Sequence, residues 1–92
     1  MIKTFKDKGL KELFERGRTS RIATRFHDRC REILDVINRA AHTNQMNLPG
    51  YVLHPMHQFD PIRWTIRVTA QWRITFEFRD GDAYRVDFEQ YH

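Results

Sequence analysis

The residues of this chain best suited to chemistry are histidines and arginines in its second half. His54 and His57 lie on either side of Pro55, and the last two residues are Tyr91 and His92. RNA cleavage without a metal needs a base for the 2′-hydroxyl, an acid for the leaving 5′-oxygen, and cations for the charge on the phosphorane. Histidine can transfer the protons near neutral pH, and arginine can supply the positive charge. Each histidine alone is more often structural, but together they favour phosphodiester chemistry.

Other kinds of site have less support. His54 and His57 are three residues apart, but no third ligand has the spacing of a metal site, so we expect no metal and no cofactor. The chain has no glycine-rich phosphate loop and no G-x-S-x-G motif. The single cysteine, Cys30, lies in an apolar helical stripe and is expected to be a buried structural thiol, with no disulfide.

The charge is unevenly distributed. The 92 residues suit one domain, residues 1–92, with a net charge of +4. Residues 1–42 contain eleven Lys or Arg against six Asp or Glu, and the remainder contains five against six. Such a surface suits a polyanion, and nucleic acid fits better than a membrane, although a basic surface can also be inert. No apolar run approaches the roughly 18 residues that span a bilayer, and no signal peptide is evident, so we expect a cytoplasmic protein.

The first half of the chain predicts two helices. Asp7 can cap a helix that Gly17 ends. Thr19 or Ser20 is expected to start a longer helix, with apolar residues every three or four positions: Ile22, Phe26, Cys30, Ile33, Ile37 and Ala41. Four arginines would follow one flank of this stripe: Arg18, Arg21, Arg25 and Arg29. They would either cover the edge of the core or form a phosphate-binding ridge.

After a loop at residues 43–50, the pattern changes to the two-residue period of β-strands. Alternating segments cover residues 51–54, 64–69, 72–79 and 84–89, and Asp80-Gly81 is typical of a hairpin turn. Residues 2–5 also alternate and could add a short strand at the edge. We therefore predict an α+β fold, with two N-terminal helices packed on one face of a twisted antiparallel sheet.

The alternation also predicts what each face of the sheet carries. The Trp, Ile, Val, Phe and Tyr residues, Tyr84 among them, should face the helices. His54 would lie on the opposite face by parity with its strand. The same face would collect a dense polar set: Arg67, Arg73, Thr75, Glu77, Arg79, Arg85, Asp87 and Glu89. Such faces are commonly polar, but this number of arginines beside histidines suits a phosphodiester. Tyr91 could stack on a base or cover the sheet edge.

Several of these segments together resemble the HigB toxins of the RelE/ParE superfamily. The resemblance covers nearly the whole chain, except the middle of the second helix and the loop from His57 to Arg63. Its segments are Met1-Ile2-Lys3-Thr4-Phe5-Lys6-Asp7-Lys8-Gly9-Leu10, Leu53-His54-Pro55, Trp72-Arg73-Ile74-Thr75-Phe76-Glu77-Phe78, Gly81-Asp82-Ala83-Tyr84 and Glu89-Gln90-Tyr91-His92.

The resemblance implies a fold, an activity and partners. Two helices would pack on a twisted antiparallel sheet whose other face holds messenger RNA in the ribosomal A site, beside 16S ribosomal RNA. The chain would be the toxin of a type II toxin–antitoxin pair and would cleave RNA by acid–base chemistry without a metal. A HigA-like helix-turn-helix antitoxin would neutralise it, and DNA would be contacted only through that antitoxin.

The resemblance also assigns roles to residues of this chain. The positions that match the family's active site are His54, Arg67, Arg73, Tyr91 and His92. Arg73 would stabilise the phosphate of the transition state, whereas His54 and His92 would transfer protons or position the substrate. Further RNA contacts are expected from His57, Arg79, Arg85, Gln90, Arg18, Arg21 and Arg25.

The chain departs from the family pattern at two positions, and two other functions are open beside the nuclease. His57 stands where the family usually has lysine, and Gln90 stands where it usually has aspartate. A ParE-like toxin that poisons DNA gyrase would share the fold without a nuclease site, but His54 and the terminal Tyr91-His92 argue against it. A non-catalytic RNA-binding module would bind RNA without cleaving it and would tolerate His54→Ala.

We predict that His57 and Gln90, in place of the usual lysine and aspartate, make cleavage weaker or change its pH dependence. Histidine is mostly neutral at pH 7, whereas lysine carries a full positive charge there. The test is to measure pH–rate profiles for the native chain and for His57→Lys. Identical profiles for the two proteins would contradict the prediction.

Overall fold

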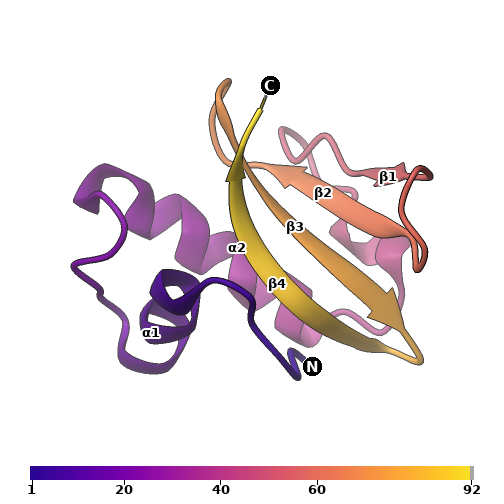
Figure 1. The fold of residues 1–92 in the computed structure, drawn as a ribbon, viewed down its shortest axis with the longest axis horizontal. Helices are drawn as coiled ribbons and strands as arrows, with labels where there is room; N and C mark the ends of the chain where they lie inside the picture. Colours follow the sequence, from indigo (N-terminus) through magenta and orange to yellow (C-terminus); the bar gives the residue numbers. More distant parts are fainter. Residues whose placement is uncertain (92) are drawn as a thin grey trace.

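The computed structural model describes residues 1–91 and has the predicted α+β fold, with helices on one face of an antiparallel sheet (Figure 1). The sheet has four strands in the order β1-β2-β3-β4, so each strand pairs with its neighbour in the sequence. None of the helices in this described part is long and apolar enough to cross a membrane. The elements are α1 (Lys8–Arg16), α2 (His27–Arg39), β1 (His54–Met56), β2 (Arg63–Arg67), β3 (Trp72–Arg79) and β4 (Asp82–Gln90), with 3₁₀ turns at Thr24–Phe26 and Thr43–Met46.

The first helix begins and ends as predicted. The Asp7 side chain accepts a hydrogen bond of 2.8 Å from the backbone N–H of Leu10. Gly17 ends the helix in the left-handed conformation, with φ 79°, which glycine adopts without steric cost. The core lies between the two helices and the sheet, and it includes Leu10, Leu13, Cys30, Ile33, Ile37, Ile66, Ile74, Phe76 and Val86.

The second helix starts later than predicted. Thr19 does not begin it, because its hydroxyl donates a 2.6 Å hydrogen bond to Glu12 on α1 and accepts one from the backbone N–H of Arg21. The Ile22 carbonyl accepts from the ring of His27 at 2.8 Å. These contacts hold residues 17–23 as an irregular connection, and α2 begins only after the 3₁₀ turn. The prediction that Arg18 and Arg21 flank this helix is therefore wrong.

The first strand is also displaced from its predicted position. Val52, in the predicted strand, has φ 48°, a left-handed conformation that ends any extended run and is rare for a β-branched residue. Tyr51 instead turns into the core, where its hydroxyl donates a 2.7 Å hydrogen bond to Glu32 on α2. The strand β1 therefore covers His54–Met56, and His54 is its first residue.

The predicted N-terminal edge strand exists only as two parallel bridges. Ile2 pairs with Ala83 and Phe5 with Val86, which places the N-terminal segment beside β4. Between them, the Arg85 N–H donates to the Thr4 hydroxyl at 2.8 Å and the Val86 N–H donates to the Thr4 carbonyl at 3.1 Å. The segment thus satisfies backbone groups of β4 that have no partner in β3.

Those backbone groups belong to a β-bulge in the β3–β4 hairpin. Glu77 pairs with Tyr84, but Thr75 pairs with Asp87, so β4 has one extra residue between these pairs. Arg85 lies there with φ 51°. The bulge reverses the parity of β4, and the prediction that Tyr84 faces the helices is wrong. Tyr84 lies on the other face, with its ring 3.8 Å from the guanidinium carbon of Arg79.

The left-handed backbone at Arg85 predicts an unusual order of stability among variants. The free energy of unfolding of Arg85→Gly should lie within about 1 kcal/mol of the native value, because glycine adopts this conformation without strain. Arg85→Val should lower the free energy of unfolding by about 1–2 kcal/mol or more, because a β-branched residue is poorly tolerated in this conformation. Urea denaturation measures both values. Equal stabilities for the glycine and valine variants would show that the bulge imposes no strain.

Candidate active site

Two arginines lie directly opposite each other on the face of the sheet turned away from α2, called here the outer face. Arg67 on β2 pairs in register with Arg73 on β3. Like charges at directly opposite positions are about 5 Å apart at Cβ and destabilise a sheet. Within residues 1–91, neither guanidinium has a carboxylate within salt-bridge distance. This end of the outer face is therefore suited to bind an anion.

Arg73 is held so that its charge remains available. Its side chain is half-buried, and its Nε is one of only two buried side-chain N or O atoms without a hydrogen-bond partner among residues 1–91. The guanidinium carbon lies 4.9 Å from the centre of the Tyr91 ring. Tyr91 is fixed in turn by its backbone N–H, which donates to the Gln71 carbonyl at 2.8 Å. A buried donor without a partner is costly unless a ligand satisfies it.

His54 reaches the same end of the outer face from the edge strand. It pairs in register with Thr65, and Arg67 follows two residues later on that strand, so His54 and Arg67 are diagonal neighbours at about 7–8 Å. The exposed ring has Nδ1 3.1 Å from the Val52 carbonyl. When Nδ1 donates to that carbonyl, the neutral ring keeps a lone pair on Nε2, as a general base requires. The other buried polar atom without a partner is the Thr65 hydroxyl, next to both residues.

One carboxylate at the site, Glu89, was not among the site residues selected from the sequence. Glu89 pairs in register with Arg73, and its side chain accepts a short hydrogen bond from the Thr75 hydroxyl. The same hydroxyl accepts a 3.0 Å hydrogen bond from buried Arg63. Alternation alone put Glu89 on the polar face, but only the bulge sets it opposite Arg73. His92 lies outside the described residues.

The remaining predicted residues of the outer face lie away from this centre. Arg79 and Arg85 are at the far end of β3 and β4, where both contact Glu77. Gln90 pairs in register with Trp72, which stacks on Phe88 in the core, so Gln90 projects from the opposite face to Arg73. His57 is exposed in the loop between β1 and β2.

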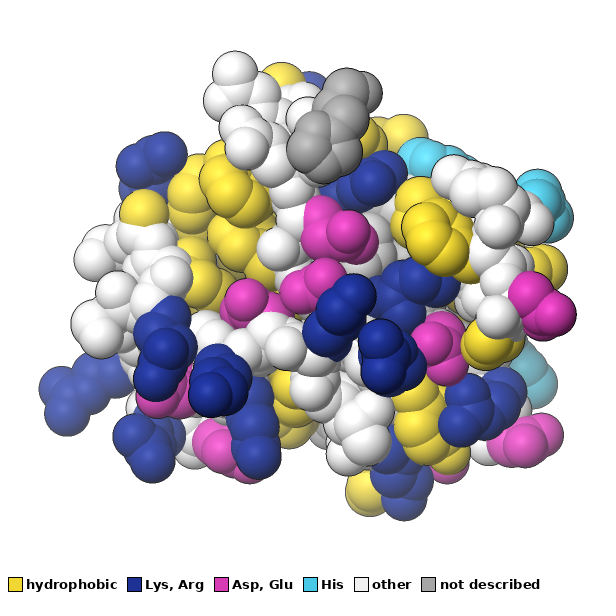
Figure 2. Space-filling model, viewed as in Figure 1, with side chains coloured by type: hydrophobic (Ala, Val, Ile, Leu, Met, Phe, Trp, Pro, Cys, Tyr) yellow, Lys and Arg dark blue, Asp and Glu magenta, His cyan; other side chains and the backbone are white. Residues whose placement is uncertain are grey.

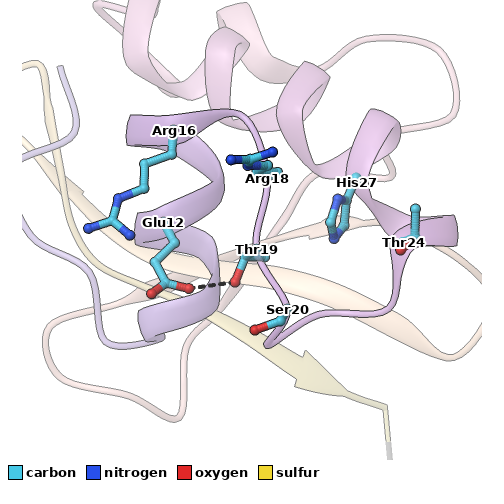
Figure 3. Close-up of a pocket in the computed structure, with 7 residues that line it drawn as sticks. All are labelled: Glu12, Arg16, Arg18, Thr19, Ser20, Thr24 and His27. Carbon is cyan, nitrogen blue, oxygen red and sulfur yellow. Dashed lines mark hydrogen bonds between the residues drawn. The ribbon is translucent and has the colours of Figure 1, made fainter.

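Of the two alternatives for the flanking arginines, covering the core edge or forming a ridge, the ridge is not formed, because Arg18, Arg21 and Arg25 all precede α2. Figure 3 shows Arg18 between α1 and His27, in a separate hollow. Thr19 and Glu12, which are hydrogen-bonded to each other, also line this hollow. Arg21 pairs with Glu12 at 3.5 Å, and Arg25 covers the Phe26 ring at 4.4 Å.

Arg29, the one flanking arginine that lies within α2, has a structural role. It donates to the backbone carbonyls of Gly50 and Arg67 at 3.0 and 3.1 Å and so ties the loop before β1 to the end of β2.

Neither the cysteine nor the potential metal ligands add a second reactive centre among residues 1–91. Cys30 is fully buried, and burial raises the pKa of its thiol to about 12, so it carries no thiolate near neutral pH. Within residues 1–91, no three His, Cys, Asp or Glu side chains are grouped so that they could hold a metal ion.

Comparison with known proteins decides which family this site belongs to. The model of a family described as RelE-like toxin of type II toxin-antitoxin system HigB matches residues 3–92. The chain belongs to this family. The resemblance found in the sequence is thereby confirmed, and HigB membership makes the chain a toxin of a type II toxin–antitoxin system. One curated HigB relative, Endoribonuclease HigB of Proteus vulgaris, is 46% identical over 92 residues, which span the whole of both chains.

The opposed arginines predict that a small anion stabilises the fold. Inorganic phosphate should raise the melting temperature of the native chain above that in chloride of equal ionic strength, because it binds between Arg67 and Arg73. Each 1 kcal/mol that phosphate binding adds to the free energy of unfolding raises the melting temperature by about 4–8 °C in a domain of this size. Arg67→Ala should lose most of this increase, whereas Arg39→Ala, which removes an exposed arginine of α2, should keep it. An equal increase in all three proteins would mean that phosphate acts only through the solvent.

Proposed function

We propose that the chain is an endoribonuclease that cleaves messenger RNA in the ribosomal A site, using its own side chains and no metal or cofactor. The observation that carries the proposal is the opposed pair Arg67 and Arg73, which has no carboxylate partner within residues 1–91 and lies beside His54 and Tyr91. The name of the Proteus vulgaris relative, identical at 46% of positions, supports the same activity. Both findings favour a nuclease over a protein that poisons gyrase.

The proposed reaction is an attack of the 2′-oxygen of RNA on the adjacent phosphorus. The new O–P bond closes a cyclic phosphate, and the bond from phosphorus to the 5′-oxygen breaks. Arg67 and Arg73 are placed to bind the phosphate oxygens, whose negative charge increases in the transition state. The two arginines already occupy directly opposite positions on β2 and β3 in the free protein.

Proton transfer would be shared by the remaining site residues. His54 supplies a ring nitrogen that can accept the proton of the 2′-hydroxyl while the Val52 carbonyl holds its other nitrogen. The leaving 5′-oxygen needs a proton, for which the candidates are Tyr91 and His92. Tyr91 packs against the guanidinium of Arg73, so it can also position a base by stacking.

The proposal includes the partners implied by this activity. The toxin would act in the cytoplasm on translating ribosomes and would contact 16S ribosomal RNA around the A site. A HigA-like helix-turn-helix antitoxin would neutralise it, and DNA would be reached only through that antitoxin.

Replacing Arg73 should slow cleavage strongly without unfolding the protein. Primer extension on a reporter message in a reconstituted translation system should show cuts within codons. These cuts should appear only when ribosomes are present. Arg73→Ala should lower the rate by about 10²–10³-fold, the usual effect of removing one transition-state donor, and Arg73→Lys should recover part of it. Arg73→Ala should be at least as stable as the native chain, because the repulsion with Arg67 is removed, and Arg73→Lys, which keeps the charge, should be about as stable as the native chain.

The same experiment separates the competing functions. An intact message with loss of gyrase supercoiling in a parallel assay would identify a gyrase poison. Binding of RNA without cuts by the native chain would identify a non-catalytic module.

A further inference from the structure

We infer that the far end of the outer face is a second subsite, which binds a nucleotide flanking the scissile one in the RNA that is cleaved. The inference rests on the proposed nuclease function and deepens it. The subsite is a hollow of about 570 Å³, within the size range of small-molecule sites. Its floor is formed by Arg63, Glu77 and Arg79 of the sheet and by Arg85 of the bulge. Phe59 of the β1–β2 loop and Lys6 of the N-terminal segment line its sides.

The hollow keeps an excess of positive charge. The buried carboxylate of Glu77 contacts the guanidiniums of Arg63, Arg79 and Arg85 at 3.4, 3.2 and 3.4 Å. One carboxylate cannot neutralise three guanidiniums. Asp60 also lines the hollow, and Lys6, which pairs with Asp87 at 4.0 Å, adds a fourth cation. The side chains of Arg79 and Arg85 are 53% and 58% exposed, so their outward N–H groups are accessible to a phosphate. Figure 2 shows Lys and Arg side chains grouped around acidic ones over the middle of this face.

The hollow also offers aromatic surface for a base. Phe59 is 44% exposed, although most phenylalanines of the described chain pack in or against the core. The planar guanidinium of Arg79, which also lines the hollow, forms a second flat surface and is backed by the ring of Tyr84. Proteins that read single-stranded RNA commonly combine such rings with arginines, because every base has a face that can stack. Inorganic phosphate has no base that could stack on such a surface, so the surface favours a nucleotide.

The backbone is strained where it forms this hollow. Arg85 holds a left-handed conformation at the bulge, and the extra residue turns both Tyr84 and Arg85 onto the outer face. Non-glycine residues in such conformations are retained where the surrounding structure fixes them, often at ligand sites. The position of Arg85 toward Glu77 is thus a product of the bulge and not of regular alternation.

The spacing of the two sites suits one RNA strand. Glu77 follows Arg73 on β3 by four residues, which is about 13 Å along an extended strand. Both lie on the same face, so a strand whose scissile phosphate rests between Arg67 and Arg73 can continue along β3 into the hollow. The occupant we assign is therefore a nucleotide of the substrate strand and not of ribosomal RNA.

The test measures how affinity depends on RNA length. Fluorescein-labelled RNA oligonucleotides, with 2′-deoxyribose at the cleavage position to prevent reaction, are lengthened by one nucleotide at a time on either side. For the native chain, one added nucleotide should raise affinity by about 5- to 100-fold, as expected for one stacked base with its phosphate. Phe59→Ala and Arg85→Gly should lose this increase, and Phe59→Tyr should keep it. All four proteins should bind the shortest oligonucleotide equally.

Controls separate this inference from the proposed nuclease function. Leu48→Ala, which trims an exposed apolar side chain outside the hollow, should behave like the native chain, and urea denaturation should show every variant folded. No length-dependent increase for the native chain, or an increase that Phe59→Ala retains, overturns the subsite even where the native chain cleaves messages. If Phe59→Ala impairs cleavage on ribosomes but not the binding of free oligonucleotides, the hollow contacts ribosomal RNA and the assignment is wrong. Absence of cleavage by the native chain counts instead against the proposed function.

Discussion

The arrangement of the outer face depends on the bulge at Arg85. A regular hairpin around the Asp80-Gly81 turn would set Thr75 opposite Val86, and one of the two would then lie on the wrong face. The extra residue lets Val86 and Phe88 enter the core while Asp87 and Glu89 take outer-face positions. The N-terminal segment supports the bulge, because Thr4 accepts hydrogen bonds from the backbone of Arg85 and Val86. The first residues of the chain therefore help to determine which side chains meet at the candidate active site.

The active end of this face is unfavourable for stability in the free protein. Arg67 and Arg73 repel each other across β2 and β3, and the two buried polar atoms without partners among residues 1–91 lie here, on Thr65 and Arg73. Each such group costs folding free energy, since desolvation is not repaid by a hydrogen bond. A phosphate between the arginines would relieve the repulsion and supply acceptors. The same features that weaken the sheet thus prepare it to bind a transition state whose charge is greater than that of the substrate.

The sequence predicted the fold class and the faces of β2 and β3, because their alternation is regular and the core needs only one register. It also predicted α1, whose cap at Asp7 and stop at Gly17 are local signals. It failed where long-range contacts overrule local pattern: Thr19 bonds Glu12 instead of capping a helix, and Tyr51 turns inward to Glu32. Of the candidate site, it selected His54, Arg67, Arg73 and Tyr91, which lie together at one end of the outer face. Glu89 lies opposite Arg73 only because of the bulge, and no local sequence motif predicts that bulge.

The two ends of the outer face differ in how their arginines are compensated, and this difference gives each end a separate task. At the far end, Glu77 holds three guanidiniums in fixed positions and partly neutralises them. The remaining positive charge can attract RNA without a rearrangement of these side chains. At the near end, Arg67 and Arg73 keep their full charge for the phosphate. Buried Arg63 joins the ends, because it contacts Glu77 and donates to Thr75, whose hydroxyl donates to Glu89 opposite Arg73. This chain of contacts keeps both carboxylates occupied with Arg63 and Thr75. Within residues 1–91, Glu89 is bonded to Thr75 and forms no ion pair with Arg73, so the Arg73 guanidinium has no carboxylate partner there and can bind the phosphate.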